Sequence, residues 1–188
     1  MSAGLKYEFT DEVKRVGSVV LRRIRALRDF GCVRRGELGG WIESETNLSH
    51  EGTAWVCGEA WVCGGARVYG EAWVYGEARV YGEARVYDKA RVYGEARVYG
   101  EARVCGEARV QTMRDVLVVQ NVGSECGVLT AFRTHAGTAV TRGCFHGTLD
   151  EFRAAVRERH GAESYHGWSY LGLANWIEHH FSGEGRPA

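Results

Sequence analysis

The sequence predicts a mainly β protein in which short strands are wound into a coil of stacked turns. The first observation is a period of six that runs unbroken from Ala54 to Val110, with a valine in every repeat. Such fixed-period self-similarity is the signature of a repeat architecture. The second is that glycine, or Asp88 in one repeat, stands two residues after each valine up to Val104. Both residue types tolerate positive φ, so we expect the chain to turn a corner after each strand.

The repeat fits an extended chain and does not fit a helix. Six residues advance by about 600° on a helix, so successive valines would drift off any one face. In an extended repeat, Ala78 and Val80 point to one side and Arg79 points to the other. Small and larger aliphatic side chains then alternate inside a narrow prism, with the large and charged side chains outside.

A valine followed four positions later by a small residue, as in Val80 and Ala84, resembles the hexapeptide repeat of the left-handed parallel β-helix. The resemblance implies three hexapeptides per triangular turn, so residues eighteen apart stack, and the repeats make about four coils. The same coil carries acyltransferases, carbonic anhydrases and proteins without known activity, so it predicts a fold and not a function. One internal column is expected to hold Val56, Val74, Val92 and Val110.

We expect four regions along the chain: an N-terminal β cap at 1–40, the β-helix at 41–113, a C-terminal α+β domain at 114–181 and a disordered tail at 182–188. The cap covers the open end of the first coil, because an open end exposes unpaired backbone groups.

Two strands are expected in the cap, at Tyr7–Phe9 and Val19–Leu27, joined by a turn at 16–18. A helix over 20–28 is an alternative for the second strand.

The first coil is irregular. Ile42 and Leu48 are six residues apart, but Leu48 and Val56 are eight apart, which predicts a bulge at 50–52. The words LGGWIE at 38–43 and NLSH at 47–50 resemble the opening of YdcK-like hexapeptide-repeat proteins of bacteria and phages. The resemblance covers about residues 5–110 and implies a β-helix whose activity is not established.

The C-terminal appendage is predicted to be βββαα. Strands are expected at 115–121, 128–134 and 138–142, and a second helix at 164–181. Thr148 and Glu151 fit a capping box at the start of the first helix, and Gly161 fits its end. The words at 143–145, 147–152 and 159–161 resemble the C-terminal piece of some phage-encoded hexapeptide-repeat proteins, which implies a phage or prophage origin.

The outside of the coil carries stacked aromatic and arginine columns. One interpretation is a solvated surface neutralised by glutamates, with Glu77 paired to Arg79 and Glu95 to Arg97. The other is a face for an oligomer or a ligand, because exposed aromatic rows are enriched at interfaces. The residues expected on that face are Trp55, Trp61, Trp73, Tyr81 and Tyr99.

The composition argues against several partners. The formal charge is zero, so no net field attracts nucleic acid or an acidic membrane, and the alternating glutamates would repel the phosphates of DNA or RNA. No apolar run approaches the ~20 residues needed to span a bilayer, and no signal peptide opens the chain. We expect a cytoplasmic protein with reduced thiols. Three cysteines occupy outward tyrosine positions of the repeat: Cys57, Cys63 and Cys105.

The coil lacks the histidines that the enzymes with this type of repeat use for catalysis or metal binding. The coil from 54 to 110 contains no histidine, so His50 is the only candidate base for an acetyl-CoA-type acyltransferase, and a loop histidine bonded to backbone is favoured. A γ-class carbonic anhydrase needs three metal-binding histidines, which the coil cannot supply. We therefore expect no catalytic residue, no metal and no cofactor.

Cysteine chemistry in the appendage is also weakly supported. Cys126, His135, Cys144 and His146 have a spacing that matches no common zinc site. Cys144 as a nucleophile, with His146 or His160 as its base, lacks a visible oxyanion hole. A buried structural Cys144 is favoured.

The sequence favours a non-enzymatic binding protein that assembles as a homotrimer or higher homo-oligomer. The specific hypothesis is a phage anti-defence sponge that sequesters a nucleotide immune signal, by analogy only. A structural or assembly module of a phage is the first alternative, and an acyltransferase is the second. Arginines, aromatics and free backbone N–H groups suit phosphates and bases. The candidate nucleotide contacts are Arg133, Arg142, His146, Ser124, Thr148 and Trp168.

Overall fold

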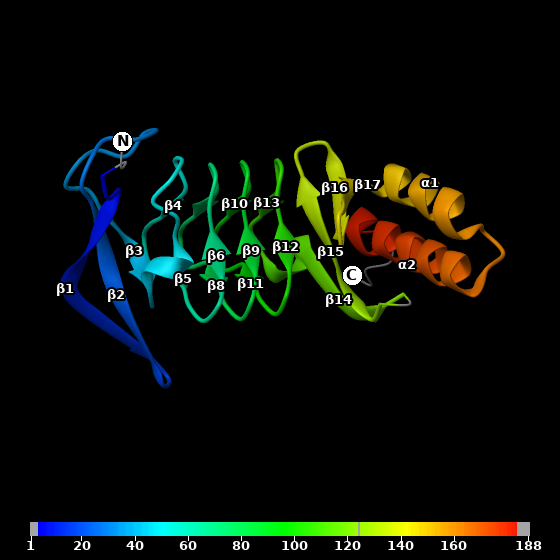
Figure 1. Cartoon of the computed structure of the whole chain (residues 1–188), viewed down its shortest axis with the longest axis horizontal. Helices are drawn as coiled ribbons and strands as arrows, with labels where there is room; N and C mark the ends of the chain where they lie inside the picture. Colours follow the sequence, from blue (N-terminus) through cyan, green and yellow to red (C-terminus); the bar gives the residue numbers. More distant parts are fainter. Residues whose placement is uncertain (1–3, 124, 184–188) are drawn as a thin grey trace. The chain divides into compact units, whose positions relative to one another are not determined.

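The computed structural model describes residues 4–123 and 125–183 of the chain (Figure 1). The chain divides into two compact units, residues 1–113 and residues 114–188. The first is built from strands, and the second carries strands followed by two helices.

The first unit is a parallel β-helix whose two-residue strands are stacked turn upon turn (Figure 1). Each strand pairs in parallel with the strand eighteen residues away, so Val74 lies between Val56 and Val92. The predicted valine column and the predicted number of coils, about four, are confirmed. The repeat strands are β4 (Trp55–Val56), β5 (Trp61–Val62), β6 (Arg67–Val68), β7 (Trp73–Val74), β8 (Arg79–Val80), β9 (Arg85–Val86), β10 (Arg91–Val92), β11 (Arg97–Val98), β12 (Arg103–Val104) and β13 (Arg109–Val110).

From Ala54 onward, the core of the coil is made of the alanine and valine of each repeat. Every one of them from Ala54 to Val110 has an exposed fraction of 0%. Burying a valine stabilises a fold by about 1.5–3 kcal/mol, so ten of them make a substantial core from a narrow prism. At the one corner without glycine, Asp88 has a φ of 56°, as its place in the repeat predicts. Its carboxylate also accepts a hydrogen bond from the Gly106 N–H at 3.2 Å.

The irregular first coil is a bulge followed by regular pairing. The N–H groups of Thr53 and Ala54 both donate to the Gly70 carbonyl oxygen at 2.9 Å, which confirms the predicted extra residues. Before the bulge, Leu48 pairs in parallel with Val68 as a single bridge, and it is preceded by the 3-10 helix η1 (Glu45–Asn47). The buried Asn47 amide fixes it by donating to two backbone carbonyl oxygens of the next turn, at 2.9 and 2.8 Å.

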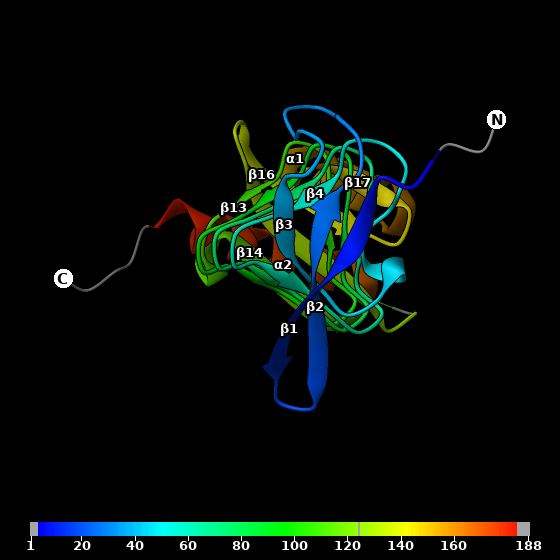
Figure 2. The ribbon, with the colours of Figure 1, turned by 90° about the vertical axis from the view of Figure 1, so that its left-hand side faces the viewer.

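The N-terminal segment extends one sheet of the coil. Strands β1 (Tyr7–Val16), β2 (Val19–Ala26) and β3 (Leu38–Ile42) pair antiparallel, and β3 pairs in parallel with β5. Figure 2 shows this hairpin lying across the end of the coil. The second segment is therefore a strand, and the alternative helix over 20–28 is not found.

Close backbone approach at the end of the coil explains the LGGW word. A Cβ added at Gly39 would lie 2.5 Å from Cγ1 of Ile24 and 2.7 Å from Cζ2 of Trp55. Both of these side chains are fully buried. The cap thus closes over the end of the valine core with no room for a side chain at position 39.

The second unit contains a four-stranded antiparallel sheet in the order β14-β15-β16-β17. Its strands are β14 (Val116–Val122), β15 (Gly127–Thr134), β16 (Gly137–Arg142) and β17 (Phe145–Thr148). The three-strand prediction is wrong by one strand. Residues 143 and 144 form a tight turn, so the chain folds back and Phe145 pairs with Arg142 before the helix begins. The 3-10 helix η2 (Met113–Asp115) precedes the sheet.

Two helices follow the sheet, α1 (Leu149–His160) and α2 (Tyr165–Ser182). The predicted capping box is present: the Glu151 N–H donates to Oγ1 of Thr148, and the Glu151 carboxylate accepts from the Thr148 N–H. Gly161 caps the end of α1 at a φ of 72°, as expected. Ser182, which was expected in a tail, is the last residue of α2, and residues 184–188 lie outside the described residues.

The sheet and helices of the second unit enclose one apolar core. Strand residues meet helix residues there, and the fully buried members are Leu129, Ala131, Val140, Ala174 and Ile177. In the described ranges 4–123 and 125–183, no helix is long and apolar enough to cross a membrane.

Candidate functional site

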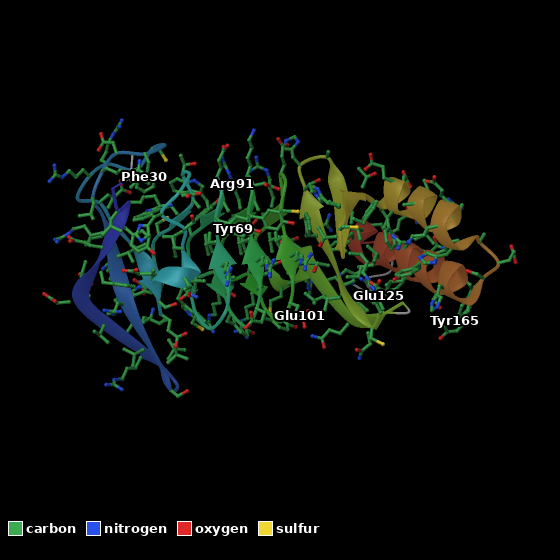
Figure 3. All side chains as sticks on the ribbon, in the orientation of Figure 1. Phe30, Tyr69, Arg91, Glu101, Glu125 and Tyr165 are labelled. Atoms are coloured by element: carbon green, nitrogen blue, oxygen red, sulfur yellow. The ribbon has the colours of Figure 1, made fainter. Side chains whose placement is uncertain are left out.

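The outer surface of the coil has three faces, each with its own columns. The Trp61 face is formed by β5, β8 and β11, the Tyr75 face by β4, β7, β10 and β13, and the Tyr69 face by β6, β9 and β12. Figure 3 shows the side chains of Tyr69 and Arg91 on the outside of the coil. The predicted stacking of Trp55 on Trp73 and of Arg67 on Arg85 is confirmed by the strand register.

Tyrosine rings stack in register on every face. The rings of Tyr69 and Tyr87 lie 5.0 Å apart at an angle of 1°, and the rings of Tyr81 and Tyr99 lie 5.5 Å apart at 12°. The pair on the Tyr75 face has the same geometry. Stacked aromatic pairs add about 0.5–1.5 kcal/mol beyond burial, so these columns stabilise the coil and leave ring edges at the surface.

The two ion pairs predicted within the arginine columns are not formed. Within the part of the chain that the structure describes, no ion pair joins Arg79 to Glu77 or Arg97 to Glu95. Arg79 instead lies over the Trp61 ring, 5.8 Å from its centre. Strands stack about 4.8 Å apart, and like charges facing each other on neighbouring strands are unfavourable. A bound anion would remove that repulsion.

The Tyr69 face carries a surface hollow of about 490 Å³. The 3-10 helix η1 forms one end of it, because η1 leads into Leu48, which pairs in parallel with Val68, and so brings polar side chains beside the repeat. The side chains around the hollow are those of Glu45, Thr46, Ser49, Arg67, Tyr69 and Arg85.

The hollow combines cations, hydroxyl groups and an aromatic edge. Arg67 and Arg85 are exposed on paired strands, and across the described ranges neither makes an ion pair. Burial raises the pKa of Tyr69, so its phenol stays neutral and can donate a hydrogen bond. Two adjacent guanidinium groups beside a stacked ring suit a ligand with both negative charge and a flat ring.

The Trp61 face is partly covered by the N-terminal hairpin. Leu21, Trp41 and Cys63 form a buried cluster, against which Trp61 and Tyr81 pack. Only Tyr99, with an exposed fraction of 42%, is well exposed among the aromatic residues predicted for a binding face.

Trp55 was expected on that face, and this prediction is wrong. Its side chain is fully buried, with its ring centre 5.2 Å from that of Phe30 and 6.4 Å from that of Tyr7. The N-terminal segment folds over this corner of the coil, which no repeat spacing could reveal. Trp73, the next residue in its column, is partly exposed.

The outward cysteines are less exposed than their repeat position predicts. Cys63 and Cys105 are buried, and Cys57 is partly buried. Burial raises the pKa of the Cys57 thiol to about 11 and also raises the pKa of Cys63. These thiols are therefore protonated and poor nucleophiles at neutral pH.

His50 is held in a structural role, as favoured from the sequence. Its Nδ1 accepts the backbone N–H of Lys6 at 3.1 Å, and its ring stacks on Tyr7 at 4.2 Å between centres. Nε2 is buried and has no hydrogen-bond partner among the described residues. Burial lowers the pKa of His50. With one nitrogen bonded to backbone and the other enclosed, the imidazole is poorly placed to take a proton from a substrate.

Lys6 closes the same corner from inside. Its Nζ donates to the Ala54 carbonyl oxygen at 2.8 Å, and it lies 5.3 Å from the centre of the Phe30 ring. Burial, helped by the charge of Arg28, lowers the pKa of Lys6 to about 8. The buried Lys6 ammonium group therefore stabilises the first coil and is not accessible to a ligand.

The two arginines predicted to contact a nucleotide in the second unit are engaged in the fold. Arg133 pairs with Asp115 at 3.2 Å and donates to the Phe181 carbonyl oxygen at 2.7 Å. Arg142 donates to the Val122 carbonyl oxygen at 2.8 Å. Their guanidinium groups fasten strands and a helix end to one another.

The other predicted contacts are not gathered into one site. Thr148 caps α1, His146 lies on β17, and Trp168 lies on α2 with an exposed fraction of 72%. Arg133 and Thr148 border one hollow, whereas Arg142 borders another. Ser124 lies outside the described residues.

Cys144 was expected to be buried, and it is exposed. It lies in the two-residue turn between β16 and β17. Among the described residues, no three His, Cys, Asp or Glu side chains come together as a metal site would require.

The hollow on the Tyr69 face was missed by the sequence analysis. Its arginines belong to a regular column, and nothing in the repeat marks Arg67 and Arg85 above the others. The available signal was the irregular run before the bulge, where Thr46 and Ser49 interrupt the repeat with hydroxyl groups.

Comparisons with known proteins identify the repeat and one relative. A family model described as YdcK Beta solenoid repeat matches residues 78–94. Over 39 residues the chain is 49% identical to a protein of Escherichia coli (strain K12) named "Uncharacterized acetyltransferase YdcK". That match covers 21% of this chain and 12% of the relative, so the chain spans about an eighth of the relative's length.

Proposed function

We propose that this chain, a YdcK-like repeat β-helix protein, is a non-enzymatic binding protein that holds a nucleotide-like anion in the hollow of its Tyr69 face. The observation that carries the proposal is the pair of exposed arginines, Arg67 and Arg85, that border this hollow without ion-pair partners in the described ranges. Beside them lies the edge of the Tyr69–Tyr87 stack.

The chemistry of the hollow favours phosphate with an attached ring. A guanidinium group bonds two phosphate oxygens at once, and hydrogen bonds to charged groups contribute about 1.5–3 kcal/mol each. The hydroxyl groups of Thr46 and Ser49 are further donors, and the Glu45 carboxylate is an acceptor for a ribose hydroxyl or a base amino group. A bare inorganic anion would use only part of this set.

The geometry of His50 supports the non-enzymatic part of the proposal. The imidazole is bonded through Nδ1 to the backbone of Lys6 and is enclosed at Nε2. A protein that sequesters its ligand binds it without changing it. The specific form of the proposal is therefore a phage anti-defence sponge that sequesters a nucleotide immune signal.

A homo-oligomer is part of the same proposal. Column-forming aromatic residues that stay partly exposed, such as Tyr75 and Tyr93, suit packing against a second copy. Sedimentation equilibrium of the purified chain would give the subunit number, with a trimer expected. A monomer at micromolar concentration would remove this part of the proposal.

The test is a thermal-shift panel with cyclic di- and trinucleotides, ADP-ribose and acetyl-CoA, followed by chromatography of the released ligand. We expect at least one nucleotide to raise Tm and to be recovered unchanged. A ligand that is consumed would refute the non-enzymatic assignment. No shift with any compound would refute the nucleotide proposal and direct attention to protein partners.

Acyltransfer is the second candidate, and the name of the Escherichia coli relative favours it. It predicts that acetyl-CoA loses its acetyl group in the presence of an acceptor amine and that His50→Ala abolishes this. The enclosed geometry of His50 argues for the opposite result, with acetyl-CoA recovered intact from both proteins.

A further inference from the structure

The second unit contains a hollow that the proposed function does not use. It has a volume of about 410 Å³ and lies among the turn after β16, helix α1 and helix α2. This volume is within the usual range for small-molecule sites, about 300–1,000 Å³. The residues on which the argument rests are Arg142, Cys144, Phe145, Arg159, His160 and Tyr170.

One side of this hollow is a continuous aromatic wall. The ring of Phe152 lies 5.4 Å from that of Phe145 and 5.8 Å from that of Tyr170. The ring of His160 follows at 5.5 Å from Tyr170, at an angle of 30°. Phe152 and Tyr170 are buried, so the wall is fixed by the core behind it. Such a wall accepts a flat apolar body at little conformational cost.

The other side carries positive charge that is incompletely neutralised. Arg142 is held by the Val122 carbonyl oxygen, and its Nε is buried without a hydrogen-bond partner among the described residues. Its Nη1 lies 3.8 Å from the Glu125 carboxylate, which is 78% exposed. Such a long, solvated pair holds the guanidinium group only weakly. Arg159 adds a second, exposed cation at the rim.

The position of the guanidinium group is built into the sheet. A Cβ added at Gly127 would lie 2.5 Å from Nη1 of Arg142, so the glycine provides the space in which the arginine lies. The cation therefore faces the hollow from a fixed strand end and is not a mobile surface side chain.

We propose that this hollow binds a small organic anion with an aromatic body, of the arylalkanoate class, with the ring on the Phe145–Tyr170 wall and the carboxylate at Arg142. The ligand carboxylate takes the place of the Glu125 carboxylate. This site lies wholly within the second unit and is independent of the Tyr69 face.

Cys144 provides a built-in reporter, because it is exposed and borders the hollow. The rate at which iodoacetamide alkylates Cys144 is measured by mass spectrometry of the full chain, with 4-phenylbutyrate or its neutral analogue 4-phenylbutanamide present at up to about 5 mM. Cys32, exposed in the other unit, is the internal control.

We expect 4-phenylbutyrate to slow alkylation of Cys144 at least 5-fold, with a Kd on the order of 0.1–1 mM, and to leave the Cys32 rate unchanged. The amide should protect at least 5-fold more weakly. Equal protection by the amide would overturn the anion site, and no protection by either compound would overturn the site altogether.

Two variants keep the proposal testable if Arg142→Gln fails to fold through loss of its bond to Val122. Glu125→Gln removes the competing carboxylate and should tighten 4-phenylbutyrate binding about 2- to 5-fold. Arg159→Gln should weaken it by a similar factor. A looser Kd in Glu125→Gln would contradict the exchange of carboxylates at Arg142.

Discussion

Arginines have different roles in the coil and in the second unit. In the coil, Arg67 and Arg85 are exposed and make no ion pair in the described ranges, and backbone hydrogen bonds join every turn to the next. In the second unit, Arg133 and Arg142 donate to backbone carbonyl oxygens, and Arg153 joins the carboxylates of α1 and α2. The coil and the second unit differ in whether arginine side chains are needed to hydrogen-bond backbone polar groups.

A repeat that satisfies its own backbone leaves its outer side chains available. A fold without repetition has strand ends and helix ends whose polar groups need partners, and long side chains supply them. Exposed charge is therefore a better guide to a ligand in the coil than in the second unit. That is why the nucleotide proposal belongs to the coil, whereas in the second unit only Arg142, whose Nη1 lies beside the exposed Glu125 carboxylate, is proposed to meet a ligand.

The sharpest way to break the coil is to place a charge inside it. Val92→Asp buries an unpaired carboxylate in the valine column and should lower the free energy of unfolding of the first unit by at least about 4 kcal/mol. The matched control is Arg91→Asp, one residue away and outside, which should change it by less than about 0.5 kcal/mol. Urea unfolding followed by circular dichroism measures both. Similar losses in the two variants would contradict the alternation on which the coil rests.

The N-terminal segment of the first unit also uses cations to bond the backbone, and Lys6 is the buried one among them. Its pKa is about 8 in the fold against 10.5 when unfolded, so the unfolded chain binds more protons between these values and stability rises with pH across that window. Relative to Lys6→Met, the wild type should gain at most about 3 kcal/mol between pH 8 and pH 10.5. Urea midpoints at several pH values measure the difference. A constant difference would show that Lys6 is charged throughout.

Two glycines sharpen the contrast between the units. Gly39→Ala places a methyl group against Ile24 and Trp55 and should cost about 1–3 kcal/mol. Gly172→Ala, in α2 with nothing within 4 Å of its added Cβ, should instead stabilise the second unit by about 0.5–1 kcal/mol. Thermal unfolding of both variants checks the signs. A neutral Gly39→Ala would mean that the cap does not close tightly on the coil.

The sequence predicted the coil well because one physical constraint recurs in every repeat. In the regular repeats the narrow core is filled by alanine and valine, and positive φ at each corner favours glycine or Asp88, so both constraints are visible in the sequence. The capping box at Thr148 was predictable for the same reason, since helix ends have local rules.

Long-range packing was beyond those local rules. Trp55 looks like Trp73 in the repeat, but the segment that buries it is more than twenty residues away in sequence. The fourth strand begins after a two-residue turn that no distinctive sequence pattern marks. Cys144 lies in this turn and is therefore exposed. The hollow at Arg67 depends on η1, whose geometry is set by the Asn47 side chain.

The most direct test of the central claim is a calorimetric titration of two arginine variants with the nucleotide that shifts Tm most. Arg85→Gln removes a cation from the hollow of the Tyr69 face, whereas Arg91→Gln removes the equivalent repeat residue from the Tyr75 face. Both should unfold within about 0.5 kcal/mol of the wild type. We expect Arg85→Gln to weaken binding at least 10-fold and Arg91→Gln to leave it unchanged. Equal Kd values for the two variants would contradict a site on the Tyr69 face.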